Sequence, residues 1–115
     1  MGLFEWGEKR FARGITKVMT RSYKAYKNHY PNLNDFELLK MTLADRPGEP
    51  AKKLLGDLQD FNFYEEMGGN LLEIIYLLVR LEYVEYMNGT LDAENIKTNT
   101  TFKNTISDVL RTELS

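Results

Sequence analysis

The amino-acid sequence predicts an all-α fold, a compact bundle of four main helices plus a short helical turn near Asp92. Three observations lead to this fold class. Residues 71–87, LLEIIYLLVRLEYVEYM, are apolar nearly all round, as in a helix that other elements cover on several sides. Further segments repeat apolar residues at helical spacing. Two Asn-x-x-Glu patterns mark helix starts.

Length and composition fit one globular domain. The chain has 115 residues, of which 43% are hydrophobic and 28% are charged. We expect a single domain over residues 1–115, with residues 1–7 as a flexible or anchoring segment. The chain has no cysteine, which excludes disulfides and thiolate metal sites. That absence fits a reducing compartment, and we expect a cytoplasmic location.

Charge positions argue against a membrane protein. Glu5, Glu8 and Lys9 leave no room for the apolar run of a signal peptide. In the most apolar segment, only six residues separate Glu73 from Arg80. A spanning helix needs roughly 20 apolar residues, so we expect no membrane span.

Residues 8–30 predict an amphipathic helix that ends before Pro31, because the residue before a proline avoids the α conformation. At about 100° per residue, its large apolar residues and its basic residues fall on opposite sides. The stripe expected to be buried contains Phe11, Ile15, Val18, Met19, Ser22 and Tyr26. The basic stripe contains Lys9, Arg10, Arg13, Lys17, Arg21, Lys24 and Lys27.

Two shorter helices should follow. Asn34-x-x-Glu37 is a variant of the capping box and starts a second helix, which should end at Arg46. A third helix is expected from Pro50 to Asp60, because proline suits the first helical position. Its expected buried stripe is Leu54, Leu55, Leu58 and Phe61.

The central helix has a clear start. Residues 61–67 should form a turn or a short helical extension, and Gly68-Gly69 breaks it. Asn70-x-x-Glu73 repeats the capping pattern and opens the central helix. We expect Glu82 and Glu85 to bring the second half of this helix toward solvent or a partner.

The end of the central helix has two interpretations. Asn88-Gly89 suits a C-cap, because both residues tolerate the left-handed conformation. The alternative is a hairpin turn, which makes Tyr83–Thr101 the wing of a winged-helix-like domain. The residues after Gly89 are poor in β-formers, so we favour the C-cap. A last helix is expected from Thr101 to Leu114.

No catalytic constellation emerges. His29 is the single histidine, and we interpret it as a polar residue in the last turn of the first helix. Ser22 lies two turns from it, about 10 Å away, whereas a nucleophile–base pair needs roughly 3 Å. The carboxylates from Asp57 to Glu73 lack EF-hand spacing and read as a solvated surface. We expect no enzyme, cofactor or metal site.

The basic stripe is the feature that suggests a ligand. Residues 1–30 carry seven basic residues against two acidic ones, and the remainder carries eight against fifteen. We rank a solvated face first, phosphate binding second and a membrane surface third. The polyanion-binding candidates are Arg10, Arg13, Lys17, Arg21, Lys24 and Lys27.

We therefore expect a non-catalytic helical module that works by protein–protein contact, as a homodimer or with another protein. The reason is that a helix as apolar as residues 71–87 is hard to cover on every side in so small a chain. The interface candidates are Tyr76, Tyr83, Tyr86 and Trp6. The alternative function is nucleic-acid binding through the basic stripe.

Overall fold

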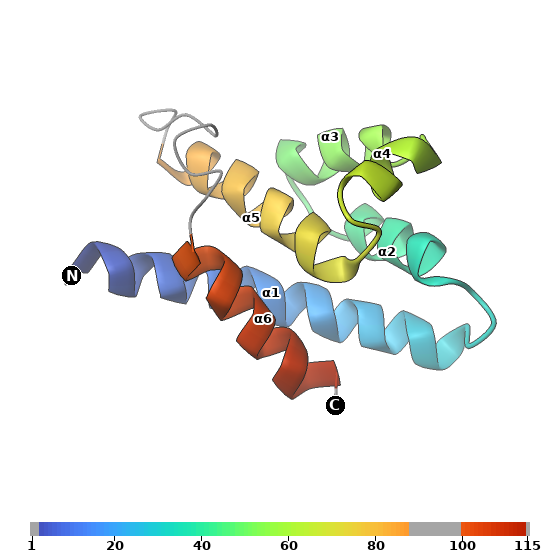
Figure 1. Cartoon of the computed structure of the whole chain (residues 1–115), viewed down its shortest axis with the longest axis horizontal. Helices are drawn as coiled ribbons and strands as arrows, with labels where there is room; N and C mark the ends of the chain where they lie inside the picture. The colour runs from blue at the N-terminus through green and yellow to red at the C-terminus, as the bar shows by residue number, and fades with distance from the viewer. Residues whose placement is uncertain (1–2, 88–99, 115) are drawn as a thin grey trace.

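The computed structural model describes residues 3–87 and 100–114, which form six helices and no strand (Figure 1). The all-α prediction is confirmed, although the expected number of main helices is too low. The helices are α1 (Leu3–His29), α2 (Asp35–Ala44), α3 (Glu49–Asp57), α4 (Phe61–Glu66), α5 (Leu71–Tyr86) and α6 (Thr100–Leu114).

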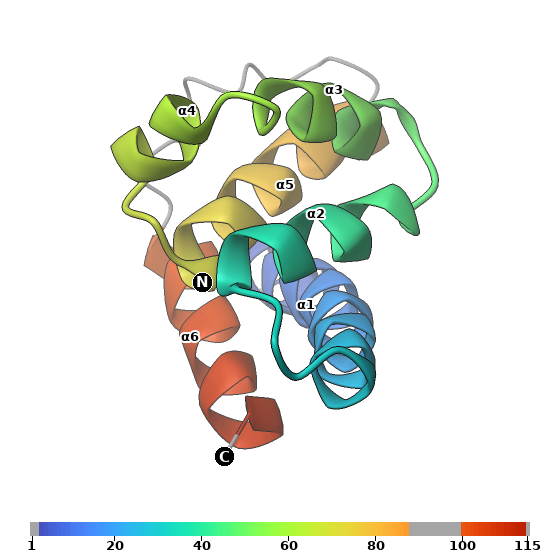
Figure 2. The ribbon, with the colours of Figure 1, turned by 90° about the vertical axis from the view of Figure 1, so that its right-hand side faces the viewer.

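The helices are arranged around α5. In Figure 1, α1 runs along the lower part of the molecule and α6 crosses it and extends below, whereas α3 and α4 form the top and α5 lies between. Figure 2 shows α6 and α2 on either side of α5. Helices α1, α3 and α6 all contact α5, and the most extensive helix pairing joins α1 to α6. The molecule measures 43 × 29 × 24 Å.

Helix α5 is the centre of the core, as its sequence predicts. It ends at Tyr86 with Met87 as the C-cap residue, so residues 83–86 are helical. The hairpin interpretation of Tyr83–Thr101 is therefore wrong. Asn88, Gly89 and the turn near Asp92 lie outside the described residues. The fully or nearly buried side chains of α5 are Ile74, Ile75, Tyr76, Leu78, Val79 and Tyr83.

Both predicted helix caps are confirmed. The Asn34 side chain accepts a hydrogen bond from the Glu37 amide at 2.8 Å, and the Asn70 side chain accepts one from the Glu73 amide at 3.0 Å. Each bond satisfies an amide that has no partner within its helix. The break before α5 requires glycine at Gly68, where φ is +95° and a side chain would be strained.

Helix α1 begins at Leu3, earlier than the expected start at Glu8. Its buried face is also rotated from the predicted one. Val18, expected in the core, is 54% exposed, whereas Thr16 and Thr20 are completely buried. Helix α1 packs more extensively on α6 than on any other helix that the structure describes, and Val18 lies instead at a small hollow beside α2.

Two tyrosines of α1 hold α2. The Tyr23 hydroxyl donates to Asp35 Oδ1 at 2.5 Å, at the start of α2, and the Tyr26 hydroxyl donates to Asp45, at its C-cap. Burial raises the pKa of Tyr23 far above its ordinary value, and the bond to Asp35 raises it further. The phenol therefore stays neutral and keeps donating.

A bidentate ion pair joins the end of α2 to α5. Arg46 Nη2 lies 2.7 Å from Glu82 Oε1, and Arg46 Nε lies 3.0 Å from Glu82 Oε2. The two side chains are 21% and 14% exposed. Glu82 is thus enclosed within the chain, and the expectation that it faces solvent or a partner is wrong. The apolar part of α5 thus ends at Glu82, whose carboxylate is paired with the Arg46 guanidinium.

We predict that Glu82→Gln lowers the free energy of unfolding by about 2 kcal/mol, between the values for exposed and for buried ion pairs. The substitution leaves the enclosed Arg46 guanidinium without its counter-charge. Urea denaturation of both chains measures the loss. Glu85→Gln is the matched control, because Glu85 is exposed on the same helix, and it should change stability by less than about 0.5 kcal/mol. Equal effects of the two substitutions would contradict the prediction.

The two buried threonines of α1 give a second prediction. Thr20 Oγ1 donates to the Thr16 carbonyl at 2.6 Å, whereas Thr16 Oγ1 has no hydrogen-bond partner among the residues that the structure describes. Thr16→Val should therefore raise the free energy of unfolding by about 1 kcal/mol, because a methyl group replaces an unsatisfied buried hydroxyl. Thr20→Val, which removes a bond, should lower it by about 1 kcal/mol. The opposite order in urea denaturation would refute this account.

Candidate functional site

The basic stripe lies on the open side of α1. Five of its six candidate residues are exposed, and Lys17 is half-buried. Arg13 and Lys17 line a hollow of about 240 Å³ whose other wall is α6, with Asp108 and Glu113. The stripe is therefore partly neutralised by acidic residues of the same chain.

Two residues of the stripe hold the end of α6. Lys24 Nζ donates to the Glu113 carbonyl oxygen at 2.9 Å, and Arg21 Nη2 lies 3.6 Å from Glu113 Oε1. A cation at a helix C-terminus offsets the partial negative charge of the last carbonyls. Arg21 and Lys24 thus have a structural role, which the sequence could not reveal because Glu113 is distant along the chain.

A second feature is an aromatic hollow where the first turns of α1 meet the end of α5. Its volume is about 380 Å³. Phe11 lines the hollow, and its ring centroid lies 5.1 Å from that of Tyr83 and 5.2 Å from that of Tyr86. Gly7 and Arg10 line its α1 side. Gly7, Arg10 and Phe11 fall together because positions three and four apart share a helix face.

The aromatic hollow combines an enclosed ring with an exposed one. Tyr83 is buried, and its ring also meets the edge of Phe102 at 5.1 Å. Burial raises the pKa of Tyr83, and the nearby Glu8 carboxylate raises it further, so the phenol remains neutral. Tyr86 is 68% exposed although its ring contacts Phe11. The hollow therefore offers aromatic surface beside a guanidinium.

The four predicted interface residues differ in the exposure of their side chains. Tyr76 and Tyr83 are buried within the chain, so neither presents a free ring to a partner. Tyr86 is exposed at the aromatic hollow. Trp6 lies on α1 one turn before Arg10, and its side chain is outside the described part of the structure. Gly7 was missed because it was placed in the segment before the first helix, and Phe11 was expected only as a buried residue of that helix.

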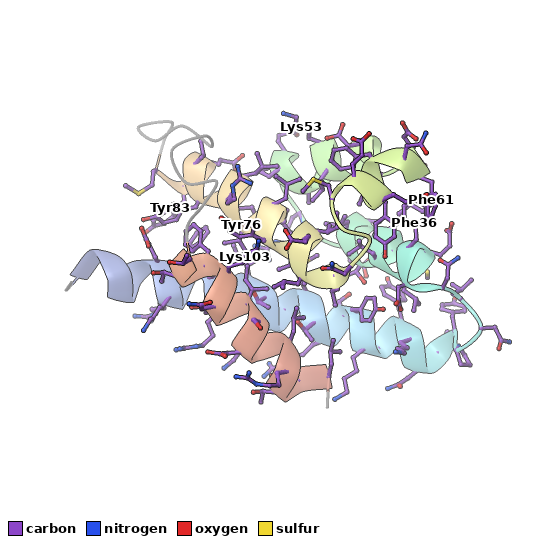
Figure 3. The ribbon with its side chains drawn as sticks, viewed as in Figure 1. Phe36, Lys53, Phe61, Tyr76, Tyr83 and Lys103 are labelled. Carbon is purple, nitrogen blue, oxygen red and sulfur yellow. The ribbon has the colours of Figure 1, made fainter. Side chains whose placement is uncertain are left out.

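The opposite end of the molecule carries a second aromatic group. The rings of Phe36, Phe61 and Tyr64 lie within 5.8 Å of one another, and Phe61 is 50% exposed (Figure 3). Phe61 was expected in the buried stripe of the third helix. That stripe stops short because α3 ends at Asp57 and Asp60 caps a new helix, its side chain accepting from the Asn62 amide at 3.0 Å.

The described residues present no cluster of metal-ligating side chains. His29 is exposed at the end of α1 and meets the Tyr30 ring edge-on at 4.6 Å. Within residues 3–87 and 100–114, no group of three or more His, Cys, Asp or Glu side chains is placed to hold a metal ion. None of the helices in these ranges combines the length and apolarity that crossing a membrane requires.

Comparisons with protein-family models, with curated proteins and with solved structures give no match to this chain.

Proposed function

We propose that the chain is a non-catalytic helical module that binds a protein, and that the aromatic hollow is its docking site. The observation that carries this proposal is the exposed Tyr86 ring beside Phe11 and Arg10 at one hollow. Tyrosine and arginine are enriched where proteins bind one another, because each combines a large contact area with hydrogen bonds.

Dimensions and charge indicate what the aromatic hollow accepts. A volume of about 380 Å³ lies within the range of roughly 300–1,000 Å³ that is usual for ligand pockets. It suits one large apolar side chain of a partner, packed against Phe11 and Tyr86. The charges beside the hollow are mixed, because Arg10 lines it and the Glu8 carboxylate lies near Tyr83. The expected partner segment is therefore a large apolar side chain with polar neighbours of either sign.

A photo-crosslinking benzophenone side chain at position 86 tests this docking site. In the cells that make the chain, it should capture a discrete protein, because Tyr86 stands at the rim of the hollow. Arg10→Glu in the same chain should reduce capture about tenfold or more, the effect of losing a central contact worth about 1.4 kcal/mol.

Val18 provides the matched control for the crosslink. It is 54% exposed on α1, and it lines a different and smaller hollow beside α2. The same benzophenone at position 18 should capture little. Equal capture at the two positions, or capture that Arg10→Glu leaves unchanged, would count against the aromatic hollow as the docking site.

Binding of a polyanion through the basic stripe is the second candidate function. It is favoured by the exposure of Arg10, Arg13 and Lys27 along one unbroken helix of 27 residues. Such a row can follow a phosphate backbone while the opposite side of the helix stays in the core. The acidic residues of α6 weaken the positive field around Lys17.

A salt series with double-stranded DNA tests this candidate. Each phosphate contact should contribute roughly 0.9 to the slope of log affinity against log salt. Replacing Arg13, Lys17 and Lys27 with Gln should therefore flatten the slope by about 2.7. The control replaces Lys52 and Lys53, both exposed on α3, and should leave the slope unchanged. Absence of binding at low salt would eliminate this function.

A further inference from the structure

We propose that Glu113, at the end of α6, limits the binding of a nucleic-acid phosphate backbone to the basic stripe, because it already occupies cations of that stripe. This inference rests on the second candidate function, binding of a polyanion through the basic stripe. It goes beyond that function by naming the group of the same chain that competes with the phosphates and so sets the affinity.

Glu113 lies against the second half of the basic stripe. Its carboxylate Oε1 is 3.6 Å from Arg21 Nη2, and its carbonyl oxygen accepts a hydrogen bond of 2.9 Å from Lys24 Nζ. At about 1.5 Å of rise per residue, the stripe from Arg10 to Lys27 is about 25 Å long, and both contacts fall inside this length. A phosphate backbone that follows the stripe must therefore pass the Glu113 carboxylate.

The ion pair between Arg21 and Glu113 is open to exchange. The Arg21 side chain is 67% exposed, whereas that of Glu113 is 22% exposed. The guanidinium therefore reaches a ligand in water without any movement of α1. An ion pair this exposed contributes little to the stability of the fold. A phosphate that replaces Glu113 on Arg21 thus loses affinity to the competition but leaves the helices in place.

The neighbouring charges single out Glu113 as the competing carboxylate. It lines the hollow between α1 and α6 together with Arg13, Lys17 and Asp108. Asp108 is already paired within α6, because Arg111 Nη2 lies 2.6 Å from its Oδ1. Glu113, in contrast, takes its counter-charge from the basic stripe itself. Neutralising Glu113 should therefore release one cation to the ligand.

A salt series with a short DNA duplex tests this inference. Glu113→Gln should steepen the slope of log affinity against log salt by about 0.9, because the released Arg21 adds one phosphate contact. The affinity should rise roughly eightfold at 0.1 M salt, which is one contact of that slope taken from 1 M salt, where the gain should vanish. In a chain that already carries Arg21→Gln, Glu113→Gln should leave the slope unchanged, because there is no Arg21 guanidinium to release.

Glu65→Gln is the matched control, since it removes the same charge from an exposed residue of α4, which lies across α5 from α1 (Figure 1). It should leave the slope unchanged. Circular dichroism of each variant checks that the helices are intact, and the exposed ion pair predicts that Glu113→Gln leaves them so.

The outcomes separate the inference from the candidate function. If the unmodified chain binds the duplex and Glu113→Gln does not steepen the slope, the inference is overturned and polyanion binding stands. An equal change from Glu65→Gln, or a change that persists without Arg21, also overturns the inference, because overall charge then explains the result. Absence of binding by the unmodified chain at low salt overturns both.

Discussion

The constraint on which the fold depends is the covering of α5. The buried side chains of this helix spread over more than half of its circumference, so neighbours are needed on several sides at once. Helices α1 and α6 cover one side and α3 covers another. Where the apolar length of α5 gives way to Glu82, the chain supplies Arg46. Burying the Glu82 carboxylate without a counter-charge would destabilise the folded state.

The sequence predicted correctly those features that depend on residues close together along the chain. The caps at Asn34 and Asn70, the break at Gly68 and the centrality of α5 depend on residues within a turn or two of one another. Prediction failed where a distant element decides the outcome. The buried side of α1 was assigned from its large apolar residues, but Thr16 and Thr20 are buried and Val18 is exposed, in a helix whose most extensive contact is with the distant α6.

The same distinction between local signals and distant contacts applies to the candidate site. Arg10 and Tyr86 were both singled out from the sequence, one as a phosphate contact and the other as an interface residue. The structure brings them to one hollow with Phe11, which was expected only as a core residue, and with Gly7, which was not singled out. Phe61 was wrongly expected in the buried stripe of the third helix. The helical spacing was extended past Asp60, which is the N-cap of a separate helix, α4. The grouping of aromatic residues at each end of the molecule is visible only in the structure.

The pairing of α1 with α6 has a consequence for how the chain folds. These are the first and last helices of the described residues, and yet no other pair among them is in more extensive contact. Their contacts, such as that of Lys24 with Glu113, close a loop of nearly the whole chain, which carries a high entropic cost before it yields stability. During synthesis, α6 emerges from the ribosome after α1 to α5. Until then α5 lacks one of its covers, and the nascent chain exposes the apolar surface that the finished protein hides.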